Sequence, residues 1–154
     1  THRRKGEHKM EALSPEKRDF VNTFLAEPRI ARMATASKIG QPHVVPVWYA
    51  WDGNTLWISA YTDTRKVKDL EENPLLSVAI DEVSPDGKTQ AVILEGKAEL
   101  LHAPAELLQR QFTWIYSRYV GADHVSEPTY QDWINDPLNA LIKLTPTRIY
   151  TWSW

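Results

Sequence analysis

The chain has 154 residues, of which 42% are hydrophobic and 25% are charged, as in an ordinary globular domain. Eighteen basic residues stand against 20 acidic ones, so the formal charge of −2 leaves no basic excess and a nucleic-acid partner is not expected. Cysteine is absent, which excludes disulfides, thiolate metal sites and Cys nucleophiles.

The surroundings of the protein are predicted from its apolar runs. No stretch of about 18 apolar residues is present, so neither a transmembrane helix nor a membrane partner is expected. The basic first residues are not followed by the apolar core of a signal peptide. We therefore expect a soluble, cytoplasmic protein. Seven Trp and six Tyr form a high aromatic load, which suits a core, a subunit interface or a planar ligand.

The first half of the chain predicts a helix followed by strands. Residues 1–13 form a basic segment that we expect to be a flexible arm, either solvated or lying over an anionic ligand, before a single domain over 14–154. A helix is predicted over 14–26, because Ser is a favoured N-cap residue and Pro suits the first helical position. Three strands are then predicted as an antiparallel meander, over 30–36, 42–51 and 56–61.

The second half of the chain also predicts helices and strands. A short helix is predicted over 62–72, then strands over 75–81 and 89–101, the second with strict apolar alternation. A helix over 104–119 precedes a predicted loop over 121–131 and two last strands, over 138–144 and 148–154. Many short strands with few helices predict a mainly β fold, a closed or nearly closed antiparallel barrel with flanking helices.

The segment from Tyr61 to Lys68 is the most informative part of the sequence. A strand ends, a turn containing Thr62 and Thr64 follows, and a helix begins with basic residues in its first turn. The positive end of a helix dipole disfavours cations, whereas a bound phosphate would favour them. This pattern indicates a phosphate site made by the Thr hydroxyls, Arg65, Lys66 and Lys68. The alternative is a solvated helix whose cations pair with Asp63, Glu71 and Glu72.

Two further features bear on a ligand. Pro46 lies inside a predicted strand and removes a backbone donor, so the strand is expected at an edge or a bulge. That break either exposes backbone groups to a ligand or protects the edge from aggregation. The His residues show no metal-binding spacing, and no P-loop, dinucleotide fingerprint or GxSxG elbow is present. A metal site is therefore not expected.

Several short motifs in order resemble the pyridoxamine 5'-phosphate oxidase-like, flavin-binding split-barrel family. The resemblance spans about residues 29–152. Its motifs are Ala34-Thr35, Gly40-Gln41-Pro42, Tyr61-Thr62, Arg65-Lys66, Asn73-Pro74 and Gly96-Lys97-Ala98-Glu99. The resemblance implies a split β-barrel that works as a homodimer, with flavin mononucleotide (FMN) at the subunit interface.

Site residues follow from that resemblance by position. Arg65 and Lys66 would hold the phosphate, and Tyr61 and Thr62 would contact ribityl or phosphate oxygens. The strand segment beside the isoalloxazine ring would consist of Val44, Val45, Pro46, Val47 and Trp48. Gln90 resembles a flavin-contacting Gln, at a spacing about one residue off. Trp152 resembles a C-terminal Trp that covers the flavin from the partner chain.

Two differences from the vitamin oxidases of this family change the activity that we expect. The Arg-Leu-His stretch by which the vitamin oxidases bind pyridoxal does not follow Trp152, and the usual basic residue near Trp48 is missing. We therefore expect an FMN-dependent oxidoreductase acting on a small-molecule substrate, rather than a vitamin oxidase.

Two alternatives remain open. One is a reductase using the deazaflavin coenzyme, whose acidic tail would need a basic groove from Lys68, Arg3, Arg4 and Lys5. The other is a non-enzymatic protein that binds a flavin, a haem or a reactive metabolite. Haem would need an axial ligand, for which the candidates are His43, His102 and His124.

Overall fold

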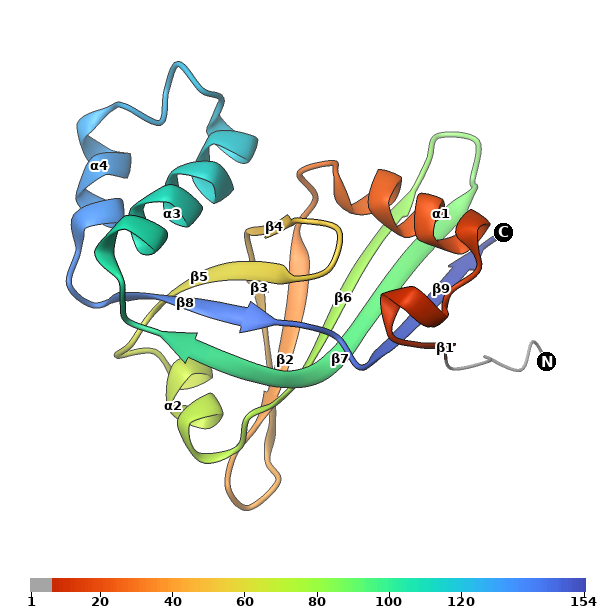
Figure 1. Ribbon diagram of the computed structural model, residues 1–154, viewed down its shortest axis with the longest axis horizontal. Helices are drawn as coiled ribbons and strands as arrows, with labels where there is room; N and C mark the ends of the chain where they lie inside the picture. The colour runs from red at the N-terminus through yellow and green to blue at the C-terminus, as the bar shows by residue number, and fades with distance from the viewer. Residues whose placement is uncertain (1–6) are drawn as a thin grey trace.

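The computed structural model describes residues 7–154, which form a curled antiparallel sheet with helices at its ends and on one side (Figure 1). The strands are β1 (Glu7–His8), β2 (Ala31–Ala36), β3 (Pro42–Val47), β4 (Tyr49–Trp51), β5 (Leu56–Tyr61), β6 (Leu75–Val83), β7 (Thr89–Leu101), β8 (Asn139–Leu144) and β9 (Arg148–Ser153). The helices are η1 (Met10–Ala12), α1 (Pro15–Leu25), α2 (Arg65–Glu72), α3 (Ala105–Val120) and α4 (Pro128–Asn135).

The sheet curls around the long strand β7. The strand order is β3-β2-β6-β7-β8-β5-β4. The first half of β7 also pairs with β9, over Gln90–Glu95, and its second half pairs with β8, over Ala98–Leu101. One 13-residue strand therefore joins the two halves of the sheet, and the result is a split barrel.

The predicted strand over 42–51 is two strands, interrupted at Trp48. β3 pairs with β2, whereas β4 pairs with β5, and the two strands lie at opposite ends of the strand order. Both antiparallel pairings of the predicted meander are therefore present, but its middle strand is broken at Trp48, where the chain passes from one end of the sheet to the other. Since β3 has only one partner strand, the prediction that Pro46 lies in an edge strand is confirmed.

The barrel interior is closed by helices at both ends. The alternation predicted for β7 is confirmed, since Val92 and Leu94 are fully buried. Phe24 of α1 and Val67 of α2 belong to the same core cluster. Ser14 is confirmed as the N-cap of α1, where its Oγ accepts a hydrogen bond from the backbone N of Lys17 at 3.3 Å.

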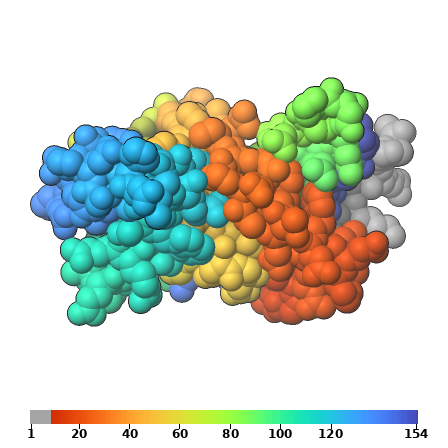
Figure 2. Space-filling model, turned by 90° about the horizontal axis from the view of Figure 1, so that it is seen from above, coloured from red at the N-terminus to blue at the C-terminus, as the bar shows by residue number. Residues whose placement is uncertain are grey.

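Helices α3 and α4 cover the outer side of β4, β5 and β8. There Phe112 and Ile115 of α3 and Ile134 of α4 form a second core with Trp57 and Leu141. Figure 2 shows this helical pair at one end of the molecule and α1 at the other, with the chain that follows α1 between them. The other half of the sheet consists of β3, β2, β6 and the β7–β9 pair. Among the described residues, no helical layer covers the outer side of this half (Figure 1).

Three expectations need correction. The predicted loop over 121–131 contains the start of α4, which begins at Pro128. The predicted arm packs on the barrel from residue 7 onward, because β1 pairs with β9 and Met10 and Leu13 are buried. Residues 1–6, including Arg3, Arg4 and Lys5, lie outside the described residues. With α3 extending over 16 residues, the class is mixed α/β rather than mainly β.

No helix within residues 7–154 combines the length and the apolar character needed to cross a membrane.

Candidate functional site

The turn between β5 and α2 leaves the start of the helix uncapped. The backbone N and the hydroxyl of Thr64 both donate to the carbonyl of Tyr61, at 3.1 and 2.6 Å. Thr64 occupies the N-cap position, but its side chain makes no capping hydrogen bond to α2. The first N–H groups of a helix have no acceptor within the helix. They are therefore available to an anion at this end of α2.

Three cations follow this turn, and α2 has no acidic residue in its first turn. The Arg65 side chain is 50% exposed, and its Nε lies 3.8 Å from the Asp69 carboxylate, which also accepts a hydrogen bond from the Thr35 hydroxyl at 2.9 Å. Lys68 is exposed, whereas Lys66 is half-buried. Within residues 7–154, neither lysine forms an ion pair with a carboxylate. The helix cations therefore do not form the pairs with Asp63, Glu71 and Glu72 that the alternative interpretation required.

Burial gives Lys66 an unusual electrostatic position. Loss of solvation lowers the pKa of its ammonium group, and the nearby charge of Asp63 opposes this shift only in part. A desolvated ammonium favours a negatively charged partner, because opposite charges attract more strongly where water is excluded.

Lys66 lies at a pocket with aromatic walls, which we call the aromatic pocket. Its volume is about 300 Å³, and it is lined by Pro46, Val47, Trp48, Ser59, Tyr61, Lys66, Tyr116 and Trp133. Of these eight residues, only Lys66 carries a charge at neutral pH. The pocket is therefore a slot for a flat apolar group with a cation at its edge.

Trp48 is held in place by its neighbours. Its ring is parallel to that of Tyr119, with an interplanar angle of 6° and centroids 4.6 Å apart. The Tyr119 hydroxyl donates to the carbonyl of Arg29 at 2.7 Å and accepts from the backbone N of Tyr49 at 3.1 Å. Stacking and these hydrogen bonds together fix one wall of the aromatic pocket.

The two tyrosines of the pocket keep their protons. Burial raises the pKa of both Tyr61 and Tyr116 above the usual value, although hydrogen bonds from Ser59 and Asn139 oppose the shift of the Tyr116 pKa. The Tyr116 hydroxyl also accepts a hydrogen bond from the side-chain amide of Asn139 at 2.8 Å. Both hydroxyls are therefore neutral groups that can donate a hydrogen bond at physiological pH.

The structure brings some of the predicted site residues together and separates others. Pro46, Val47, Trp48, Tyr61 and Lys66 line the aromatic pocket, and Thr62 and Thr64 form its adjoining turn.

The other predicted contacts lie elsewhere. Val44 is 63% exposed on the outer side of β3, while Val45 packs against the core and therefore does not line the pocket. Gln90 lines a different pocket, beside α1. Trp152 lies on β9, opposite Ala91, with its ring stacked on Trp154 at 5.9 Å. Within one chain, neither Gln90 nor Trp152 belongs to the aromatic pocket.

Sequence reasoning missed three lining residues, Ser59, Tyr116 and Trp133. Within the predicted helix over 104–119, Tyr116 is spaced from Phe112 and Tyr119 so that the three rings share one side, and this spacing was a usable signal for a planar ligand. Trp133 was missed because the predicted loop over 121–131 covered the start of α4 and no element was predicted over 132–137. As for metals, no group of three or more His, Asp or Glu side chains within the described part of the chain could hold an ion.

The fold defines a split-barrel protein. Residues 18–153 match the family model described as pyridoxamine 5'-phosphate oxidase, and the chain belongs to this split-barrel family. The family includes flavin and deazaflavin enzymes as well as haem-binding proteins. A search of curated proteins finds no match.

Solved structures show the same fold. A conserved hypothetical protein of Mycobacterium tuberculosis is 28% identical, with a TM-score of 0.72, covering 91% of this chain and 84% of that one. An FAD-binding protein of Mesorhizobium loti is 25% identical, with a TM-score of 0.66 and coverage of 92% and 93%. An F420 reductase is 24% identical, with a TM-score of 0.63 and coverage of 83% and 94%.

Proposed function

We propose that the chain is an FMN-dependent oxidoreductase that acts on a small molecule. The observation that carries this proposal is Lys66, a half-buried cation at the uncapped start of α2 and at the edge of the aromatic pocket. A phosphate attached to a flat ring system satisfies both halves of this arrangement, since helix N-termini bind phosphates and aromatic walls bind rings. Membership of a family that includes flavin enzymes supports it.

The residues present fit the two parts of FMN. Lys66, Arg65 and the first N–H groups of α2 would hold the phosphate. Trp48, Tyr61 and Pro46 would surround the ring, in a pocket whose volume of about 300 Å³ is at the lower end for ligand pockets, as expected for the ring alone. When bound, the isoalloxazine ring supplies hydride or electron transfer. The protein orients the ring, excludes water and offers the neutral hydroxyl of Tyr116.

A homodimer would complete the site. The outer side of β3, β2, β6 and β9 carries exposed apolar side chains, with Val44 63%, Leu75 58% and Val83 64% exposed. Strand alternation places Trp152 and its neighbour Ala91 on this same side. We propose that two copies pack through this face, so that the partner's Trp152 covers the ring. Gln90, the residue before Ala91, alternates to the other side of the sheet and lines the pocket beside α1, so we do not propose a flavin contact from it.

A deazaflavin coenzyme is the second candidate. The observation that favours it is the exposed Lys68 beside the half-exposed Arg65, which extends the positive charge beyond the aromatic pocket. An acidic coenzyme tail would find cations there. The F420 reductase that this chain resembles has the same fold.

A haem-binding role is less well supported. An axial ligand is needed on the haem iron, and the eight lining residues of the aromatic pocket include no His, Met or Cys. His124 is instead engaged with Glu127, with its Nδ1 2.6 Å from the carboxylate.

Absorption spectroscopy of the purified protein, followed by competitive titration with FMN and the deazaflavin coenzyme, tests the proposal. We expect flavin absorption bands, or saturable FMN binding by the stripped protein that is tighter than deazaflavin binding. A Soret band would indicate haem. A protein that binds neither FMN nor the deazaflavin coenzyme would refute the proposal. Tighter binding of the deazaflavin would select the second candidate.

A further inference from the structure

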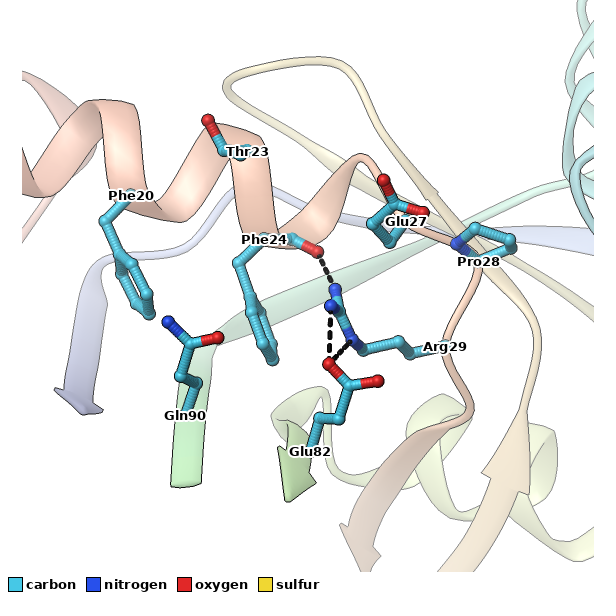
Figure 3. Close-up of a pocket in the computed structure, with 8 residues that line it drawn as sticks. All are labelled: Phe20, Thr23, Phe24, Glu27, Pro28, Arg29, Glu82 and Gln90. Carbon is cyan, nitrogen blue, oxygen red and sulfur yellow. Dashed lines mark hydrogen bonds and ion pairs between the residues drawn. The ribbon is translucent and has the colours of Figure 1, made fainter. Parts of the chain in front are cut away.

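A second pocket lies beside α1 and shares no lining residue with the aromatic pocket. We call it the α1 pocket (Figure 3). Its volume is about 510 Å³, within the range of about 300–1,000 Å³ that is typical of small-molecule sites. It is lined by Phe20, Thr23, Phe24, Glu27, Pro28, Arg29, Glu82 and Gln90.

Aromatic rings form the apolar wall of the α1 pocket. Phe20 and Phe24, one helical turn apart on α1, are stacked with centroids 5.7 Å apart and an interplanar angle of 21°. The Arg29 guanidinium lies 4.0 Å from the centroid of Phe24 and donates to the Glu82 carboxylate at 2.8 Å. Phe24 is buried and thereby fixed, while Phe20 is only partly buried. The partly exposed ring of Phe20 therefore supplies the accessible apolar surface of this pair.

The side-chain amide of Gln90 is a polar group of the α1 pocket that could meet a ligand. Figure 3 shows the amide of Gln90, on β7, directed toward the ring of Phe20. Within residues 7–154 this side-chain amide has no hydrogen-bond partner. An amide offers both a donor and an acceptor, so it complements a ligand amide or carbonyl.

The charges around the α1 pocket disfavour an anion. Its lining carries two carboxylates, Glu27 and Glu82, and one guanidinium. That guanidinium, on Arg29, is already engaged by Glu82 and by the carbonyl of Phe24. An anionic ligand would meet a net negative lining with no free cation, whereas a neutral ligand would meet no such repulsion.

We propose that the α1 pocket is a second binding site, for a neutral planar aromatic compound that carries an amide or a carbonyl group on its rim. The ring packs against Phe20 and Phe24, and the rim group exchanges hydrogen bonds with Gln90. The site is independent of the cofactor in the aromatic pocket, since the two pockets have no residue in common.

Two ligands of equal shape test this site by calorimetry or ligand-observed NMR. The neutral 2-naphthamide should bind about two- to fivefold more tightly than the anionic 2-naphthoate, because exposed and screened charges contribute up to about 1 kcal/mol. Equal affinities, tighter naphthoate binding or no binding of the amide would overturn the proposal.

Variants then locate the binding. Gln90→Leu should weaken 2-naphthamide binding about fivefold, since a neutral hydrogen bond contributes about 1 kcal/mol. Phe20→Ala should weaken it by a similar factor, because an aromatic contact contributes about 0.5–1.5 kcal/mol. The matched control Gln109→Leu, at an exposed position of α3, should bind as the unaltered protein does. Glu82→Gln removes one carboxylate and frees the guanidinium, so it should narrow or reverse the preference for the amide. Unchanged binding in the first two variants, or loss in Trp48→Ala alone, would place the ligand elsewhere and overturn the proposal.

Discussion

Replacing Lys66 by Met removes one charge and keeps most of the side-chain length. Among the eight described residues that line the aromatic pocket, Lys66 alone is charged, and burial already lowers the pKa of its ammonium group. In the free protein this charge is held at a desolvation cost. The apo variant should therefore fold at least as stably as the parent, so that weakened cofactor binding cannot be ascribed to unfolding.

The magnitude follows from the half-buried position of Lys66. A hydrogen bond to a charged group contributes about 1.5–3 kcal/mol when its partner is otherwise unpaired. Since each 1.4 kcal/mol is a factor of ten, the Kd for FMN should rise about 10- to 150-fold in Lys66→Met. Lys68→Met, on the same helix but exposed, should raise it less than about threefold, because screened surface charges contribute little.

Flavin fluorescence provides the assay. FMN is titrated into stripped protein, and the Kd of parent, Lys66→Met and Lys68→Met are compared at one ionic strength, because phosphate contacts are sensitive to salt. Urea unfolding of the apo variants supplies the stability control. An unchanged Kd in Lys66→Met, or equal losses in both variants, would refute the phosphate site.

Three other substitutions test separate parts of the structure. Tyr119→Phe keeps the ring but leaves the carbonyl of Arg29 without its hydroxyl donor, so urea should show a loss of about 1–3 kcal/mol; an unchanged midpoint would contradict this. Burial raises the pKa of Tyr49 to about 12 from 10.0, so the folded state keeps its proton longer and stability falls as pH rises from 10.0 to about 12. Tyr49→Phe should flatten that decline, and an equally steep decline would contradict the assignment. Trp152→Leu should weaken FMN binding about tenfold if the partner's Trp152 covers the ring, whereas an unchanged Kd would argue against the proposed dimer.

Local sequence patterns predicted much of the fold. The strand over 56–61 and the long strand over 89–101 have the predicted bounds, because apolar alternation and flanking turn residues specify them within a few residues. The start of α1 was equally readable, since Ser14 and Pro15 define a helix N-terminus through local geometry. In such segments, the residues that determine the structure lie within a single turn or a single strand.

What escaped prediction depends on distant contacts. At the strand break, the ring of Trp48 stacks on Tyr119, which lies on a helix far along the chain. Likewise, Tyr116 and Trp133 enter the aromatic pocket only through the packing of α3 and α4 against the sheet. The cations of α2 were visible in the sequence, but only folding distinguishes the half-buried Lys66 from the exposed Lys68.

A crystal structure of the protein with FMN would test the central proposal most directly. We expect the phosphate within hydrogen-bonding distance of the Lys66 ammonium and of the first backbone N–H groups of α2, with the ring between Trp48 and Tyr61. FMN whose phosphate lies away from α2, or whose ring occupies the α1 pocket instead, would contradict it.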